Sequence, residues 1–293
     1  MIADIYIAAI ITTILALSVI GGSLWYSASR EDRPFLILLL VLMLPMNPLA
    51  FFGVRLPLDT WLATLLSQQP GTFTFIRLWY APVTEELAKL WPLLIPWVYQ
   101  NIVSRKLKLH QIALAIGLGF GVGEAWTVAK LLSASAEVAQ YPWYQLGGYM
   151  GERFMVCIMH AGFTGAALHF IVAQKRIFLG LSAAMLLHFM ANFPIYLASQ
   201  DVAGFGSAVW AIILQFWVLA YFMAMGVLLA YMAYGKQWAK KLLLGKMKCP
   251  SCEQVYDRPL FGLNLFHKRY ERCPHCHRWH MVSMFNVPEE NEL

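Results

Sequence analysis

The chain has 293 residues, of which 59% are apolar and 13% are charged. Soluble globular domains carry about 25% charged residues, so this composition excludes an ordinary soluble protein and indicates a chain that crosses a membrane several times. The formal net charge of +6 does not by itself indicate a nucleic-acid partner, because ten of the 22 Lys and Arg residues follow Gly235, as expected beside the cytoplasmic face of a membrane.

Apolar runs predict the membrane-spanning helices, since one span needs about 20 mostly apolar residues. Seven spans are predicted, at residues 6–26, 35–52, 77–98, 112–132, 153–173, 178–198 and 207–234. Pro45 and Pro48 interrupt the second span, and turn residues in the segment 53–76 also allow a kinked or re-entrant element there. The span count is therefore open by one. We predict an all-α polytopic membrane domain of about seven transmembrane helices over residues 1–235.

Basic residues in the connections predict the orientation, because short cytoplasmic loops keep an excess of Lys and Arg. They gather after the first, third, fifth and seventh predicted spans. These residues are Arg30, Arg33, Arg105, Lys106, Lys108, Lys175, Arg176, Lys236, Lys240, Lys241, Lys246 and Lys248. We therefore expect an integral protein of the cell membrane, with its N-terminus outside and its C-terminus in the cytoplasm.

Several ionisable side chains fall inside predicted spans, where each costs roughly 2.5–3.5 kcal/mol on insertion scales and indicates a functional site. They are Glu85, Glu86, Lys89, Glu124, His160 and His188, with Asn192 four residues later, and His169 near the opposite boundary of its span. Counted from the outer ends of the spans, five of these residues fall in one layer, roughly 9–15 Å deep: Glu85, Glu124, His160, His188 and Asn192. The i, i+4 spacing predicts Lys89 as counter-ion of Glu85.

Carboxylates, imidazoles and an amide in one hydrated pocket provide a base to activate water, an acid for a leaving amine and donors for an oxyanion. Hydrolysis of an amide bond inside the membrane is the first interpretation. A proton- or ion-coupled transporter uses the same residue types, and a non-catalytic scaffold that binds other membrane helices is a third. Residue types alone leave these open.

Four motifs carry a resemblance to a known family. They are the run Thr84-Glu85-Glu86-Leu87-Ala88-Lys89, the run from Gly119 to Glu124, the isolated His160, and His188 with Asn192. In this order, over about residues 77–198, the chain resembles the PrsW family of intramembrane proteases, related to the CAAX prenyl endopeptidases and the bacteriocin-processing enzymes. The resemblance implies a multi-helix, glutamate-dependent peptidase acting on membrane-associated protein substrates; some family members cleave anti-sigma factors.

Each motif implies a role for the residue that matches it. The paired glutamates fall on Glu85 and Glu86, either of which would be the base for the attacking water. His160 would be its partner or proton donor, and His188 with Asn192 would stabilise the oxyanion. Glu124 would orient the water or a histidine. The CAAX enzymes typically carry E-E-x-x-x-R and a histidine in the second motif, whereas this chain has Lys89 and Glu124, which argues against prenylated substrates.

A second metal ion in the membrane site is not favoured from the sequence, although Glu and His are permissible zinc ligands. The chain has no H-E-x-x-H motif of the zinc peptidases.

Two C-x-x-C pairs near the C-terminus predict a structural Zn²⁺ site. Cys249 and Cys252 are separated by 20 residues from Cys273 and Cys276, a spacing typical of a four-cysteine zinc ribbon, and the fifth cysteine, Cys157, is expected to be a buried small side chain. We therefore expect a basic juxtamembrane linker over 236–248 and a zinc-ribbon domain with its tail over 249–293, in the cytoplasm, where thiols stay reduced.

The small core of the ribbon is expected to use Tyr256, Phe261 and Phe266. Its basic residues are Arg258, Lys268, Arg269, Arg272 and Arg278. They could contact nucleic acid, but nearby anionic lipid explains them equally well, so nucleic acid is not the expected partner. A protein partner is the preferred hypothesis for this module.

Overall fold

The computed structural model describes residues 3–104, 108–201, 204, 207–235, 246–259, 262–265 and 268–283. The chain divides into two compact units, Met1–Leu229 and Ala230–Leu293, and each is described by itself. The predicted basic linker over 236–248 lies outside the described residues except for its last three.

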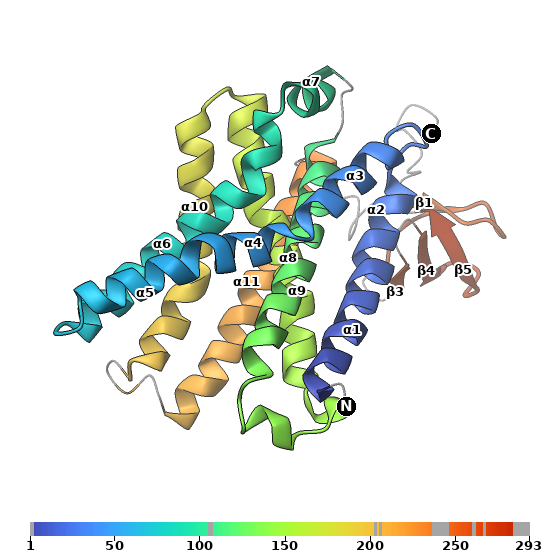
Figure 1. Ribbon diagram of the computed structural model, residues 1–293. Coiled ribbons are helices and arrows are strands. Elements are labelled where there is room, and N and C mark those ends of the chain that lie inside the picture. Colours follow the sequence, from blue (N-terminus) through green and yellow to red (C-terminus); the bar gives the residue numbers. More distant parts are fainter. Residues whose placement is uncertain are drawn as a thin grey trace. The chain divides into compact units, whose positions relative to one another are not determined.

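The helices of the chain form a bundle, drawn from blue to orange in Figure 1. They are α1 (Asp4–Ala16), α2 (Gly22–Ser27), α3 (Arg33–Met43), α4 (Met46–Ala50), α5 (Leu56–Leu65), α6 (Pro70–Leu90), α7 (Pro96–Ser104), α8 (Leu109–Leu132), α9 (Gly147–Leu168), α10 (Ile177–Ser199) and α11 (Ala208–Tyr234). Three π-helical segments, η1 (Leu17–Gly21), η2 (Phe51–Arg55) and η6 (His169–Ala173), continue neighbouring helices. Short 3₁₀ turns form η3 (Trp91–Leu94), η4 (Val138–Gln140) and η5 (Trp143–Gln145).

Among the described residues, six helical segments are long and apolar enough to cross a membrane, which confirms the all-α polytopic fold. They are Asp4–Ser27, Arg33–Leu65, Leu109–Leu132, Gly147–Ala173, Ile177–Ser199 and Ala208–Tyr234. The remaining predicted span, 77–98, coincides with α6, η3 and the start of α7. This segment carries several charges, and its helix is interrupted near Pro92 and Pro96, which lack the N–H that an α-helix needs.

The segment 53–76, for which a kinked or re-entrant element was expected, forms a helical hairpin. The helix that begins at Arg33 turns at Leu44–Pro45, continues through α4 and η2 into α5, and reverses at residues 66–69 into α6. The two arms are joined by the buried Asp59, whose carboxylate accepts a hydrogen bond from the Tyr80 hydroxyl and pairs with Arg77 Nε at 3.2 Å. Figure 1 shows α5 and α6 side by side.

Helix α8 is the most enclosed of the candidate spans, and glycines on two of its faces allow this. On one face, a Cβ atom at Gly117 would overlap the backbone of Ala161, and one at Gly121 would lie 2.8 Å from Cys157 Cα. Close backbone approach of this kind is the use that G-x-x-x-G spacing has in membrane helices. The contact places α8 directly against α9.

The other glycine face of α8 contacts the second span. A Cβ atom at Gly119 would overlap the carbonyl oxygen of Leu40, and one at Gly123 would overlap that of Leu44. The four glycines therefore hold α8 between α9 and the α3–α4 segment, immediately before Glu124.

The second unit contains two small antiparallel sheets, which is consistent with the expected zinc-ribbon module. In one sheet, β1 (Lys246–Lys248) pairs with β2 (Val255–Asp257). In the other, the order is β3 (Gly262–Leu265), β4 (Lys268–Arg272) and β5 (Trp279–Ser283). Tyr256 belongs to the buried core as expected, with Met247, Val282 and the cysteines around it. Phe261 and Phe266 lie outside the described residues.

Two of the arginines considered for nucleic-acid contact are internal. Arg258 and Arg269 are 4% and 2% exposed, and both lie beside the fully buried Glu271. Tyr256 donates a hydrogen bond to the same carboxylate at 2.9 Å. These arginines neutralise a buried acid, so the sequence-based interpretation of them as possible surface contacts is wrong.

The glycine contacts of α8 generate a stability prediction. We expect Gly117→Ala to lower the apparent melting temperature of the detergent-solubilised protein, because overpacking against backbone costs about 1–3 kcal/mol. The matched control is Gly226→Ala in α11, where a Cβ atom would meet nothing within 4 Å. Equal melting temperatures for the two variants would contradict the close α8–α9 contact.

Candidate active site and metal cluster

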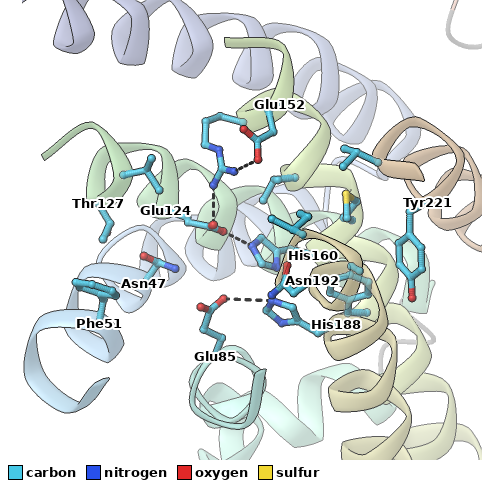
Figure 2. Close-up of a pocket in the computed structure, with 18 of the residues that line it drawn as sticks. Asn47, Phe51, Glu85, Glu124, Thr127, Glu152, His160, His188, Asn192 and Tyr221 are labelled. Carbon is cyan, nitrogen blue, oxygen red and sulfur yellow. Dashed lines mark hydrogen bonds and ion pairs between the residues drawn. The ribbon is translucent and has the colours of Figure 1, made fainter. Parts of the chain in front are cut away.

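The sequence-predicted residues converge on one cavity of about 310 Å³ inside the bundle. Its wall is contributed by α4, η2, α6, α8, α9, α10 and α11. Five of the six candidate residues line it: Glu85, Glu124, His160, His188 and Asn192. The volume is within the range of small-ligand pockets. Figure 2 shows Glu85 reaching toward His188 from one side of the cavity and Glu124 toward His160 from another.

Glu85 is the member of the glutamate pair that faces the cavity. Its Oε1 atom accepts a hydrogen bond of 3.0 Å from Arg55 Nη1, and its Oε2 atom lies 3.8 Å from His188 Nε2. The expectation that Lys89 is the counter-ion of Glu85 is therefore wrong. Arg55 takes that place, from the π-helical segment η2 that follows α4.

Glu86 points into the protein and is fully buried, as is Lys89. Its Oε1 atom accepts hydrogen bonds from Lys89 Nζ and, at 2.6 Å, from His188 Nδ1. Lys89 Nζ also lies 2.9 Å from His160 Nδ1. Because a buried charge is tolerated only when it is paired, the Glu86–Lys89 pair serves as an internal anchor for both histidines.

These contacts assign the proton positions on the two imidazole rings. The Glu86 carboxylate can only accept, so His188 donates through Nδ1, and in the neutral tautomer the Nε2 lone pair faces Glu85. The Lys89 ammonium can only donate, so His160 carries its proton on Nε2 and donates it to Glu124 Oε2 at 2.5 Å.

Glu124, on α8, is the third glutamate of the site and contacts both His160 and Arg153. Its Oε1 atom accepts a hydrogen bond of 2.7 Å from Arg153 Nη1, which comes from the neighbouring helix α9. Arg153 is 8% exposed and also donates to Glu152 at 2.5 Å. Figure 2 traces this line of contacts from Glu152 to His160.

Arg55 and Arg153 are the site residues that the sequence reasoning missed. Arg55 lies in the connection after the second predicted span and Arg153 at the first residue of the fifth, where a basic residue does not by itself indicate a site. The signal that could have found them is charge balance. Three glutamates inside the spans require three cations, and Lys89 is the single Lys or Arg well inside a predicted span.

Aromatic rings enclose the polar groups. Phe163 stacks on His188 with ring centroids 5.2 Å apart, and Phe120 meets His160 edge-on at 5.0 Å. The same two phenylalanines flank Lys89 Nζ at 5.3 and 5.1 Å from their centroids, close enough for cation–π attraction. These contacts restrict the rotamers of the groups that line the cavity.

The donor set of the cavity fits a metal ion. Glu85, His160 and His188 each offer one ligand atom, and the three atoms lie within 4.8 Å of one another. Two histidines with one glutamate are a known zinc set of peptidases. His188 already has the usual outer partner, a carboxylate on the ring nitrogen that would not bind the metal. His160 would have to exchange its contact with Glu124.

The second candidate site is the four-cysteine cluster in the ribbon, whose Sγ atoms also lie within 4.8 Å of one another. Cys249 and Cys276 are 3.6 Å apart at sulfur, and Cys252 and Cys273 are 3.7 Å apart. Four thiolates around Zn²⁺ with Zn–S bonds of about 2.3 Å would place the sulfurs about 3.8 Å apart. The cluster can therefore hold one metal ion.

The two cysteine pairs lie in backbone turns of the same kind. Cys249 N–H bonds to the carbonyl of Gln254 and Cys273 N–H to that of Arg278, both at 2.9 Å. The residue after each pair's second cysteine has a positive φ, 58° at Glu253 and 57° at His277. Such turns aim both thiols of a pair at one point.

Hydrogen bonding also favours the thiolate form at one ligand. Burial raises the pKa of the Cys249 thiol, but hydrogen bonds from the backbone N–H groups of Cys252 and Ser251, together with those from the Cys252 and Cys276 thiols, outweigh burial and lower the pKa to about 6. A thiolate is the form that binds metal.

The comparison with protein families finds a family model that matches the chain. The model described as PrsW family intramembrane metalloprotease matches residues 33–232. The matched segment contains every charged residue of the cavity and ends before the four cysteines. No curated protein and no solved structure matches the chain at a significant level.

The cysteine geometry generates a metal-content prediction. We expect Cys273→Ser to remove one zinc per chain, because three thiolates and a hydroxyl form a much weaker site. Elemental analysis of the purified protein measures it. The control is Cys157→Ser, a buried cysteine of α9 outside the cluster, which should keep its zinc. If both variants keep their zinc, the assignment of the four-cysteine site is wrong.

Proposed function

This chain belongs to the PrsW family of intramembrane proteases, and from that premise we propose that it hydrolyses peptide bonds of membrane-associated proteins in the cavity, with Glu85 activating the attacking water. The observation that carries the proposal is the orientation of the glutamate pair. Glu85 faces the cavity, whereas Glu86 is fully buried against Lys89 and His188. Family membership disfavours the transporter and scaffold alternatives.

The attacking water would sit between Glu85 and His188. Two acceptor atoms 3.8 Å apart can both hydrogen-bond to one water molecule, and the His188 tautomer leaves Nε2 as an acceptor. Arg55 holds the other oxygen of Glu85 and so fixes the carboxylate in place. A positioned base of this kind contributes about 10²–10⁴-fold to a rate.

The reaction balances with one water molecule and one peptide bond. Glu85 Oε2 takes a proton as the water oxygen bonds to the carbonyl carbon, and the carbonyl oxygen becomes an oxyanion. The amide of Asn192, on the same wall as His188, is the proposed donor to that oxyanion. His188 Nε2 accepts a hydrogen bond from the hydroxyl that the water leaves on the carbon. The C–N bond then breaks as the leaving nitrogen receives the proton from Glu85.

The remaining charged residues position these groups. Glu124, held by Arg153, fixes His160, and His160 shares Lys89 with Glu86, which in turn holds His188. Both ring nitrogens of His160 are engaged in this chain of contacts. We therefore assign His160 and Glu124 positioning roles rather than proton donation to the substrate.

A metal-dependent form of the reaction is the second candidate, because the donor set fits and the matching family model describes metalloproteases. Glu85, His160 and His188 would hold the ion. When bound, such an ion lowers the pKa of water and polarises the scissile carbonyl. Glu86 would then orient His188, and Asn192 would keep its place beside the oxyanion.

The proposed setting follows from the charges of the connections. We propose that the N-terminus is outside, that the four cysteines hold structural Zn²⁺ in the cytoplasm, and that the substrate is a membrane-spanning or membrane-associated protein. The domain division proposed from the sequence, 1–235, 236–248 and 249–293, places the ribbon after a basic linker.

Substitution of the proposed base gives the main test. We expect Glu85→Gln to reduce cleavage of a single-span substrate in liposomes roughly 10²–10⁴-fold, because the amide cannot take a proton from water. Melting temperature should change little, since Arg55 can still donate to the amide oxygen. Glu137→Gln, at an exposed position outside the cavity, is the matched control. Undiminished cleavage by the Glu85 variant would sink the assignment.

The Glu86→Gln variant distinguishes the role of Glu86 from that of Glu85. We expect this variant to lose cleavage and also to melt at a lower temperature, because it leaves Lys89 as an uncompensated buried cation, typically at a cost of about 3–5 kcal/mol. A stable but inactive Glu86 variant, combined with an active Glu85 variant, would reverse the roles of the pair.

Metal removal decides between the two forms of the reaction. In the Cys273→Ser background we expect no remaining zinc and cleavage that resists 1,10-phenanthroline. Retention of one ion that His188→Ala then removes, together with chelator-sensitive cleavage, would establish the metal-dependent form in place of direct activation by Glu85.

A further inference from the structure

The outer face of the three-stranded ribbon sheet carries a row of exposed apolar side chains. The strand register places Leu263 opposite Tyr270 and Tyr270 opposite Met281, so the three side chains share one face. Their exposed fractions are 60%, 40% and 47%. The whole set on this face, here called the apolar face, is Leu263, Leu265, Tyr270, Trp279 and Met281.

This face takes no part in the core of the ribbon. The alternate residues Arg269, Glu271 and Val282 point to the opposite face and are buried there. On the apolar face, Tyr270 and Trp279 stack on each other with centroids 5.1 Å apart, which orders two large rings at the surface. An ordered, exposed apolar patch of this kind marks a binding surface.

Basic residues border the apolar face. Lys268 and Arg272 flank Tyr270 on β4, are exposed, and point to the same side of the sheet. Across the described part of the ribbon, the exposed charged side chains are five basic and two acidic: Lys246, Lys248, Lys268, Arg272, Arg278, Glu253 and Asp257. The surface therefore fits an anionic partner that also accepts apolar side chains.

The length of the linker limits the distance between the apolar face and the membrane. Eleven residues, 235–245, separate the end of the last span at Tyr234 from the start of β1 at Lys246, and a chain of this length reaches at most about 40 Å. Three of the eleven are lysines. The ribbon is thus tethered near a bilayer surface, where its effective concentration against lipid is high.

We propose that the apolar face binds the anionic lipid surface of the membrane that the helices span. Tyr270 and Trp279 would lie at the headgroup level, where such rings are favoured, with Leu263 and Met281 beneath them. Lys268 and Arg272 would contact lipid phosphates. Nucleic acid fits less well, because the aliphatic side chains offer nothing to bases and two of the ribbon's arginines are buried beside Glu271.

The test uses the full-length protein, one chain per lipid nanodisc, with a genetically encoded environment-sensitive fluorescent amino acid at Met281. We expect a blue shift and quenching by brominated lipid in discs with phosphatidylglycerol, and neither in discs of phosphatidylcholine alone. High salt should reduce both effects. The same reporter at Glu253, exposed in the first cysteine turn, is the control and should respond less.

Two variants test the chemistry of the surface. Lys268→Gln should lower the ratio of docked to undocked ribbon about fivefold, which corresponds to ~1 kcal/mol for one basic residue at an anionic surface. Trp279→Ser should lower it further. Both variants must keep the zinc content of the wild type, which shows that the ribbon is intact.

Three results would overturn the proposal. The reporter could behave identically in anionic and zwitterionic discs. It could respond to added single-stranded RNA and not to lipid, which would make the face a nucleic-acid surface. It could respond only in discs that hold two chains, which would make it an interface between copies of the protein.

Discussion

Three carboxylates inside the bundle are each neutralised by a cation, and these three ion pairs determine the arrangement of the site. Glu85 pairs with Arg55, Glu86 with Lys89, and Glu124 with Arg153. A lone charge removed from water costs several kcal/mol, so none of the three glutamates could remain ionised in the bundle without its partner. Two of the pairs join different helices, and neutralising the charge therefore also fixes the relative positions of η2, α6, α8 and α9.

The pairs divide the polar groups into two sets. Glu86 and Lys89 are sealed from the cavity and orient the imidazoles of His188 and His160. Glu85 and Asn192 remain on the cavity wall, where a substrate could meet them. A hydrolytic site in lipid needs both sets, because reactive groups must face water while the groups that hold them must not exchange their partners for water.

The sequence was sufficient for the membrane-spanning helices, for the set of polar residues that line the cavity, and for the cysteine cluster, because each depends on local composition or spacing. It was insufficient for the pairing of Glu85. Lys89 and Arg55 were both available, and i, i+4 spacing says only that two residues share a helix face. Nor could it show which neighbouring glutamate faces the cavity, since adjacent helical residues differ by about 100° and the answer depends on how the whole helix is rotated. The burial of Arg258 was missed because its acid, Glu271, is distant in the sequence and lies on β4, whereas Arg258 follows β2.

Because of the glycine-lined contact between them, α8 and α9 should move together as one rigid body. Sliding α8 along its neighbour would bring Cβ-bearing residues against backbone atoms, whereas tilting both helices together changes no contact between them. Membranes of different thickness are accommodated mainly by helix tilt. The distance between Glu124 and His160 is thereby insulated from lipid composition, and the proton arrangement of the site can be the same in thin and thick bilayers.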